Sequence, residues 1–205
     1  MWPSSIRPAS RLPGAAGHEA PEAWRFSALV GTLAELSSHG ASASASVAMR
    51  LVWEAQGEGE PVAWVTERRR CFYPPDALAT GIDLAGLAVV RVPEATLIAR
   101  AADTLVRSGG FGLVVLDMGD LTRLPDKQLT RLLGLARKHG TAILCLTRKP
   151  EAEPSLGGLV SLRATTRRER LAPGTFACEV YGLKDKRRPP GWRQQEAFRG
   201  PAGLR

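Results

Sequence analysis

The segment LIARAADTLVRSGGFGLVVLD (residues 97–117) contains both kinds of secondary structure that determine the fold class. Its apolar residues recur at helical spacing as far as Val106, and Ser108-Gly109-Gly110 then ends the period, so we predict a helix over 97–106. The run Leu113 to Leu116 is apolar throughout and too short for a helix, which is typical of a strand covered on both faces. A helix leading into such a strand predicts a parallel α/β sheet.

The same alternation extends in both directions along the chain. We predict a helix that begins near Ser46 and another between Pro125 and Gly140, and further buried strands at 62–65, 87–92 and 142–146. After residue 158 the segments 159–171 and 176–183 are Arg-rich and lack a helical period, so we expect antiparallel strands that extend the sheet. The predicted fold is therefore α/β, a mostly parallel sheet flanked by helices with C-terminal antiparallel strands.

Length and composition restrict the class of protein. The 205 residues are 44% hydrophobic and 23% charged, which indicates a globular chain rather than a disordered or fibrous one. Residues 1–25 are rich in Pro, Ser, Ala and Gly and are predicted to be a disordered leader, with one domain over 26–205. No apolar run reaches about 18 residues and no signal core is present, so we expect no membrane span and no secretion. Three cysteines without zinc spacing favour the cytoplasm.

The formal net charge of +8 is concentrated at the end of the chain. Residues 160–205 hold 11 Lys and Arg against 4 Asp and Glu, while residues 1–159 are almost balanced. This asymmetry favours a polyanion or an acidic protein face as partner, and a solvated basic surface is the alternative. The candidate DNA-binding or partner-binding residues are Arg163, Arg167, Arg168, Arg170, Lys184, Lys186, Arg187 and Arg188.

The order strand, tight turn, helix, and a later strand that ends in Asp117 is the layout of a nucleotide-binding α/β domain. The turn reads SHGASASAS (residues 38–46), where a working phosphate loop needs glycines and a lysine. Ala43 takes the place of a glycine and Ser44 that of the lysine, so we expect no catalysis and no cofactor, with a residual ATPase as the alternative. The degenerate site would comprise Ser38, Gly40, Ala43, Ser44, Ala45 and Asp117.

The other candidates for chemistry are isolated. We expect Asp117 to form local hydrogen bonds rather than hold magnesium, and Glu67 to pair with the arginines at 68–70 that follow it. His39 and His139 have no partner at a catalytic spacing and are predicted to be surface residues. No catalytic triad, nucleophilic cysteine or metal site is predicted.

Four segments, taken in order, resemble RecA-type recombinases: 53–60, 81–87, 102–109 and 181–187, the last being similar to the family's Lys-Asn-Lys strand. The resemblance covers about 30–205 and implies a RecA-like core. The departures are the missing lysine, Arg148 in place of the sensing Gln, and shortened segments after Asp117 and Thr147, where recombinases carry their DNA loops. The leader replaces the polymerisation helix.

A short RecA-like chain without ATPase residues most resembles the ImuA accessory proteins of mutagenic translesion synthesis and, less closely, the division inhibitor SulA. This resemblance implies a non-catalytic, nucleoid-associated adaptor of the SOS response that docks on RecA, on ImuB and on an error-prone polymerase. Lys184 and Lys186, two apart on a strand, would share the face that reaches a neighbouring protomer's nucleotide. A weak, sequence-independent DNA-binding module is the alternative, although Phe176, Tyr181, Trp192 and Phe198 are spaced too widely for an obvious stacking platform.

Overall fold

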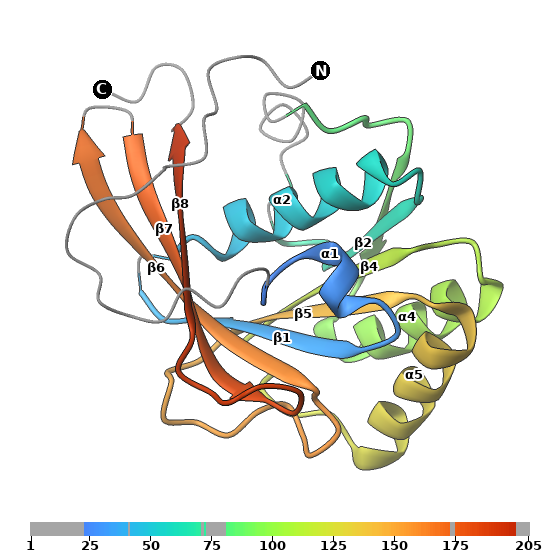
Figure 1. Ribbon diagram of the computed structural model, residues 1–205. Coiled ribbons are helices and arrows are strands. Elements are labelled where there is room, and N and C mark those ends of the chain that lie inside the picture. Colours follow the sequence, from blue (N-terminus) through green and yellow to red (C-terminus); the bar gives the residue numbers. More distant parts are fainter. Residues whose placement is uncertain (1–22, 41, 71, 73–80, 173–174, 200–205) are drawn as a thin grey trace.

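The computed structural model describes residues 23–40, 42–70, 72, 81–172 and 175–199. Its centre is an eight-stranded sheet in the order β3-β2-β4-β5-β1-β6-β7-β8 (Figure 1). The strands are β1 (Leu33–Ser38), β2 (Val62–Glu67), β3 (Leu87–Val92), β4 (Leu113–Gly119), β5 (Ala142–Arg148), β6 (Leu162–Ala172), β7 (Thr175–Asp185) and β8 (Arg193–Arg199). The strands from β3 to β6 are parallel, whereas β7 and β8 pair antiparallel, which confirms the predicted fold class.

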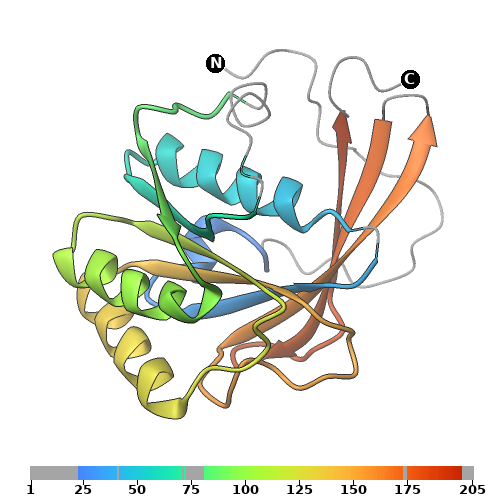
Figure 2. The same ribbon diagram turned by 180° about the vertical axis from the view of Figure 1, so that it is seen from behind.

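Helices cover both faces of the parallel strands. Helices α1 (Phe26–Leu29) and α2 (Ser44–Gly57) lie on one face, while the short 3-10 turn η1 (Ala95–Leu97), α4 (Ile98–Ser108) and α5 (Asp126–His139) lie on the other (Figures 1 and 2). Alternate residues of each central strand belong to the two cores, so Val115 packs on the α2 side and Val114 on the α4 side. This is why the central strands are apolar throughout.

Two of the predicted helices end where glycine allows the chain to turn. Gly109 follows α4 with φ of 69° and Gly140 follows α5 with φ of 68°, the left-handed conformation that favours glycine after a helix. The helix predicted from Ser46 begins at Ser44 instead. The segments that connect β4 to α5 and β5 to β6 are 120–125 and 149–161.

Three features differ from the sequence-based expectations. Strand β3 lies at the sheet edge, so Val89 is 36% exposed rather than covered on both sides. Strand β8 is not among the expected strands, because its polar residues show no apolar run. The predicted leader extends to residue 25, yet Trp24 is buried and its ring lies 6.4 Å from that of Trp192, centroid to centroid. The remainder of the predicted leader, residues 1–22, lies outside the described residues.

Candidate functional site

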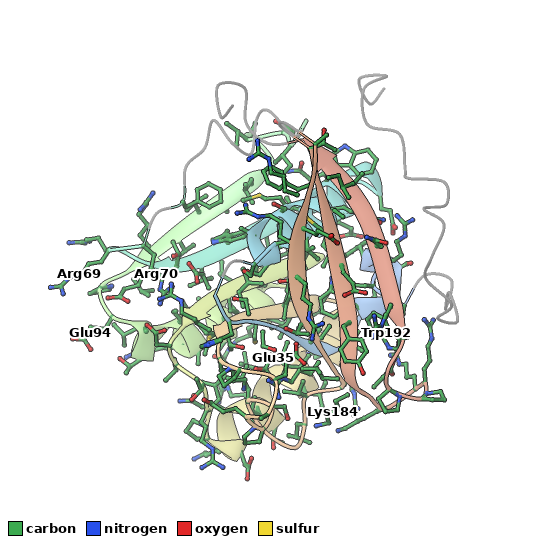
Figure 3. All side chains as sticks on the ribbon, turned by 90° about the vertical axis from the view of Figure 1, so that its left-hand side faces the viewer. Glu35, Arg69, Arg70, Glu94, Lys184 and Trp192 are labelled. Atoms are coloured by element: carbon green, nitrogen blue, oxygen red, sulfur yellow. The ribbon has the colours of Figure 1, made fainter. Side chains whose placement is uncertain are left out.

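The carboxyl ends of the parallel strands meet at one edge of the sheet, onto which Figure 3 looks. The pairing places Thr66 of β2 beside Asp117 of β4, and Ser38 of β1 beside Arg148 of β5. The turn between β1 and α2 lies at the same edge, because β1 leads directly into it. The structure therefore brings together the residues of the predicted degenerate phosphate loop, the strand-end acid Asp117, and Arg148.

The turn before α2 contains a glycine in the left-handed conformation but no lysine. Gly40 has φ of 69°, and a β-carbon added there would meet no other atom within 4 Å. Ala43, the N-cap residue of α2, is buried and has φ of −106°. Ser44 opens the helix, and its Oγ lies 3.1 Å from Oγ of Ser42. The helix N-terminus consequently presents backbone N–H groups and small hydroxyls, with Ala45 exposed beside them and no ammonium to reach a phosphate.

Asp117 is held by its protein neighbours. Its Oδ2 accepts a hydrogen bond of 3.0 Å from Oγ1 of Thr66, and its Oδ1 lies 3.6 Å from a guanidinium nitrogen of Arg70. Arg70 also lies 3.6 Å from Asp120, which in turn pairs with Arg148 at 3.6 Å. The expected pairing of Glu67 with the following arginines was wrong for Arg70, whose partners are acids at the end of the next strand in the sheet. We call Arg70, Asp117, Asp120 and Arg148 the outer network.

A second network lies at this edge, and the sequence analysis missed it. Glu35 of β1 and Lys149, just after β5, form an ion pair of 2.6 Å in which both side chains are 0% exposed. Glu35 also accepts hydrogen bonds of 2.8 Å from Oγ1 of Thr147 and from the backbone N–H of Leu156. The sequence contained a signal for this pair: Glu35 interrupts the apolar run of β1, and Lys149 directly follows β5, the strand that pairs with β1. We call Glu35, Thr147 and Lys149 the inner network; Glu35 is labelled in Figure 3.

The predicted basic surface divides into buried and exposed members. Arg163 is only 4% exposed and donates to Oγ of Ser37 at 3.3 Å and to the carbonyl of Pro150 at 3.0 Å, so its assignment to a binding surface was wrong. A cation whose hydrogen bonds are satisfied inside the fold is not available to a partner. Farther along β6, Arg167 pairs with Glu151 at 3.0 Å, and Arg168 lies over the ring of Phe176 at 4.9 Å. Arg170 is exposed near the end of the strand.

Lys184, at the end of β7, and Lys186, just after it, contact the segment 155–158. Nζ of Lys184 lies 3.4 Å from Oγ of Ser155, and Nζ of Lys186 donates to the carbonyl of Gly158 at 2.8 Å. Burial, and then the charge of Lys186, lower the pKa of Lys184. Arg187 donates to the carbonyl of Ala28 at 3.0 Å, and Arg188 is exposed. The basic residues thus form two groups rather than one continuous surface.

Neither a cluster of metal ligands nor an activated cysteine is found among the described residues. Within the described part of the chain no cluster of three His, Cys, Asp or Glu residues could hold a metal.

Of the two histidines discussed above, His39 is exposed as expected, but His139 is half-buried with its ring against Gly109, contrary to the surface position predicted for it. Cys145 and Cys178 are free and buried, and burial raises the pKa of both thiols, so neither is activated as a nucleophile.

Comparison with known proteins finds recombinases that are similar in sequence or in fold. No family model matches the chain. The RecA protein of Fusobacterium nucleatum subsp. nucleatum is 28% identical over 133 residues, covering 56% of this chain and 35% of that protein. The chain spans about a third of the length of that relative. A crystal structure of the RadB recombinase superposes with a TM-score of 0.63 at 19% identity, covering 83% of this chain and 88% of that one.

The chain therefore has the RecA-like α/β fold, with a mostly parallel sheet and antiparallel C-terminal strands, and its sequence is similar to that of a RecA recombinase. Across the described residues, none of the helices is both long and apolar enough to span a membrane.

Proposed function

We propose that this chain is a non-catalytic RecA-like adaptor of the SOS response. It docks on RecA and on the complex of ImuB with an error-prone polymerase, and it limits the growth of RecA filaments. The observation that carries the proposal lies at the carboxyl ends of the parallel strands. Ser44 stands where a phosphate loop requires a lysine, and Asp117 is engaged by Thr66 and Arg70. A RecA-like protein with this edge has lost the means to bind and hydrolyse ATP, but it keeps the fold that other RecA-like surfaces recognise.

The direction of docking follows from the polarity of a filament. Protomers in a filament join through two unlike faces, so a chain that offers one of them binds an end and stops growth. By the resemblance to recombinases, Lys184 and Lys186 would correspond to the lysines that reach the neighbouring protomer's nucleotide. In the isolated chain both contact the carbonyl of Gly158, at 3.5 Å and 2.8 Å. Docking would exchange these bonds to a neutral carbonyl for bonds to phosphate oxygens, in which both partners are charged.

The test is a RecA polymerisation assay on single-stranded DNA with increasing amounts of this protein. We expect inhibition that saturates well below one molecule per RecA, because only filament ends are blocked. The double variant Lys184→Ala/Lys186→Ala should inhibit less, while the matched pair Lys127→Ala/Lys138→Ala on exposed positions of α5 should inhibit like the parent. The proposal would be contradicted by inhibition that needs one molecule per RecA, vanishes at high salt and is the same in the parent and in both double variants.

Calorimetry provides a separate check of the non-catalytic assignment. Because no ammonium stands at the start of α2, we expect no hydrolysis of ATP with or without DNA, and no micromolar binding. Magnesium-dependent ATP binding that is lost in Asp117→Asn would overturn this assignment.

A sequence-independent DNA-binding module is the second candidate, and the exposed arginines of β6 favour it. Arg168 and Arg170 stand on a strand that extends beyond its pairing with β1, and Arg168 already stacks on an aromatic ring. In this function the protein would compete with RecA for DNA, and inhibition would require amounts comparable to the DNA lattice.

A further inference from the structure

Arg70 is the central member of the outer network. Its guanidinium lies 3.6 Å from a carboxylate oxygen of Asp117 and 3.6 Å from one of Asp120, so a single cation bridges two acids. Its side chain is 22% exposed, and Nε is buried with no hydrogen-bond partner. A buried N–H without a partner costs free energy, so the arginine is held at this place by its charges rather than by ideal hydrogen bonding.

The backbone has a notch that accommodates this guanidinium. Gly119, between the two acids, has φ of 54°, and a β-carbon there would collide with the terminal atoms of Arg70. A side chain at position 119 would therefore exclude the arginine, apart from the backbone strain it would introduce. The arginine and the glycine fit each other as two parts of one site.

The position of Arg70 is fixed from its own side as well. The turn after β2 is closed by hydrogen bonds from the N–H of Arg68 to the carbonyl of Val92 at 2.8 Å and from the N–H of Arg70 to the carbonyl of Glu67 at 2.9 Å. Its neighbour Arg69 is exposed and extends away from the strand ends (Figure 3). One arginine of the run 68–70 is thus directed to the acids, while its neighbour faces solvent.

Two carboxylates that converge at a strand end, with a fixed threonine hydroxyl beside one of them, form the kind of oxygen-rich site that attracts a divalent cation. Here the two negative charges of Asp117 and Asp120 are matched by the two positive charges of Arg70 and Arg148. The site is electrically balanced by the chain itself, so a divalent ion would have to displace a guanidinium to enter.

We propose that Arg70 is a built-in counter-ion that occupies the place of a divalent cation between Asp117 and Asp120. The edge thereby keeps its charge balance and its shape with no ligand bound, and the surface formed by the ends of β2, β4 and β5 does not depend on nucleotide or magnesium. This inference rests on the outer network alone and stands whether or not the protein acts on RecA.

The experiment compares Mn²⁺ binding, by electron paramagnetic resonance, to the parent protein and to Arg70→Met, which keeps the apolar stem and removes the charge. We expect the variant to bind one Mn²⁺ at least about tenfold more tightly than the parent. Arg69→Met is the matched control and should bind like the parent. The double variant Arg70→Met/Asp117→Asn should lose the gained site.

Thermal unfolding gives a second measure that remains informative if Arg70→Met is less stable. Excess Mn²⁺ should raise the Tm of Arg70→Met by about 2–4 °C, since an ion that binds only the folded state stabilises it, and should leave the parent unchanged. Equal Mn²⁺ affinity in the parent and Arg70→Met, an equal gain in Arg69→Met, or a gain that survives Asp117→Asn would each overturn the proposal.

Discussion

The inner and outer networks lie at the same edge of one sheet and join strand ends through opposite charges, yet they differ in burial and geometry. The Glu35–Lys149 pair is 2.6 Å long with both side chains 0% exposed. In the outer network each ion pair measures 3.6 Å, and the exposed fractions run from 20% for Asp117 to 71% for Asp120. Opposite charges therefore interact strongly in the inner network, where water is excluded, and more weakly in the outer network, where water screens them.

The inner network is complete, as a buried one must be. Glu35 accepts from Lys149, Thr147 and the backbone N–H of Leu156, and Lys149 donates in addition to the carbonyl of Pro154 at 2.7 Å. These bonds tie the segment 149–161 to β1 and β5. In this chain, therefore, a buried ion pair anchors the segment that follows β5.

Breaking the inner network should have the largest effect. We expect Lys149→Met to lower the free energy of unfolding by about 3–5 kcal/mol, because it leaves the Glu35 carboxylate buried without its counter-ion. Urea unfolding measures this directly. The double variant Glu35→Leu/Lys149→Met should recover part of this stability, since no charge remains buried. A decrease below about 1 kcal/mol in Lys149→Met would mean that water reaches Glu35 and that the two networks do not differ in kind.

A smaller decrease in stability is expected from the notch of the outer network. Gly119→Ala should cost about 1–2 kcal/mol, because alanine disfavours a positive φ and its methyl displaces the Arg70 guanidinium. Gly134, on the exposed face of α5 with no atom near its substituent position, is the matched control. Gly134→Ala should stabilise by roughly 0.5–1 kcal/mol in the same unfolding experiment. Equal effects at the two glycines would show that the notch is not specific.

The contrast between buried and exposed cations can also be tested within β6. The triple variant Arg167→Ala/Arg168→Ala/Arg170→Ala should weaken DNA binding equally for all sequences and reduce the slope of log K against log salt by about 1 for each phosphate that is no longer neutralised. Its unfolding free energy should change little. Arg163→Met should do the reverse, because its guanidinium bonds to Ser37 and Pro150 inside the fold. Fluorescence anisotropy at several salt concentrations decides between them, and sequence-selective binding would contradict the expectation.

The smallest effect is expected on the outer surface of the helices. Hydrogen bonding from Arg131, and secondarily from Arg107, lowers the pKa of Asp103. A carboxylate whose pKa is lower in the folded state stabilises the fold above its ordinary pKa, and this contribution is lost as the pH falls through the folded value. Asp103→Asn should therefore be slightly less stable than the parent at neutral pH, and the difference should shrink below about pH 4. Unfolding free energies from pH 7 to pH 3 measure this, and a constant difference would contradict it.

Much of the fold was predictable because it depends on local pattern. The apolar runs of β4 and β5, and the helical periods of α4 and α5 with their terminal glycines, are determined by neighbours in the chain. The turn that precedes α2 was predictable for the same reason, since its residues are consecutive. Strand β8 was not predictable because Arg193–Arg199 is stabilised by its pairing with β7, and the segment has no apolar signal of its own.

The sequence by itself determined which chemical groups lie at the carboxyl ends of the parallel strands: Ser44 after β1, Asp117 in β4, and a run of arginines beyond β2. Only the tertiary structure decided which of them meet. Arg70 bridges Asp117 and Asp120. Lys149 forms an ion pair with Glu35, and the side chain of Arg163 is buried. The physical reason is that an ion pair depends on distance and burial, and both are fixed by the register of neighbouring parallel strands that lie far apart in the chain.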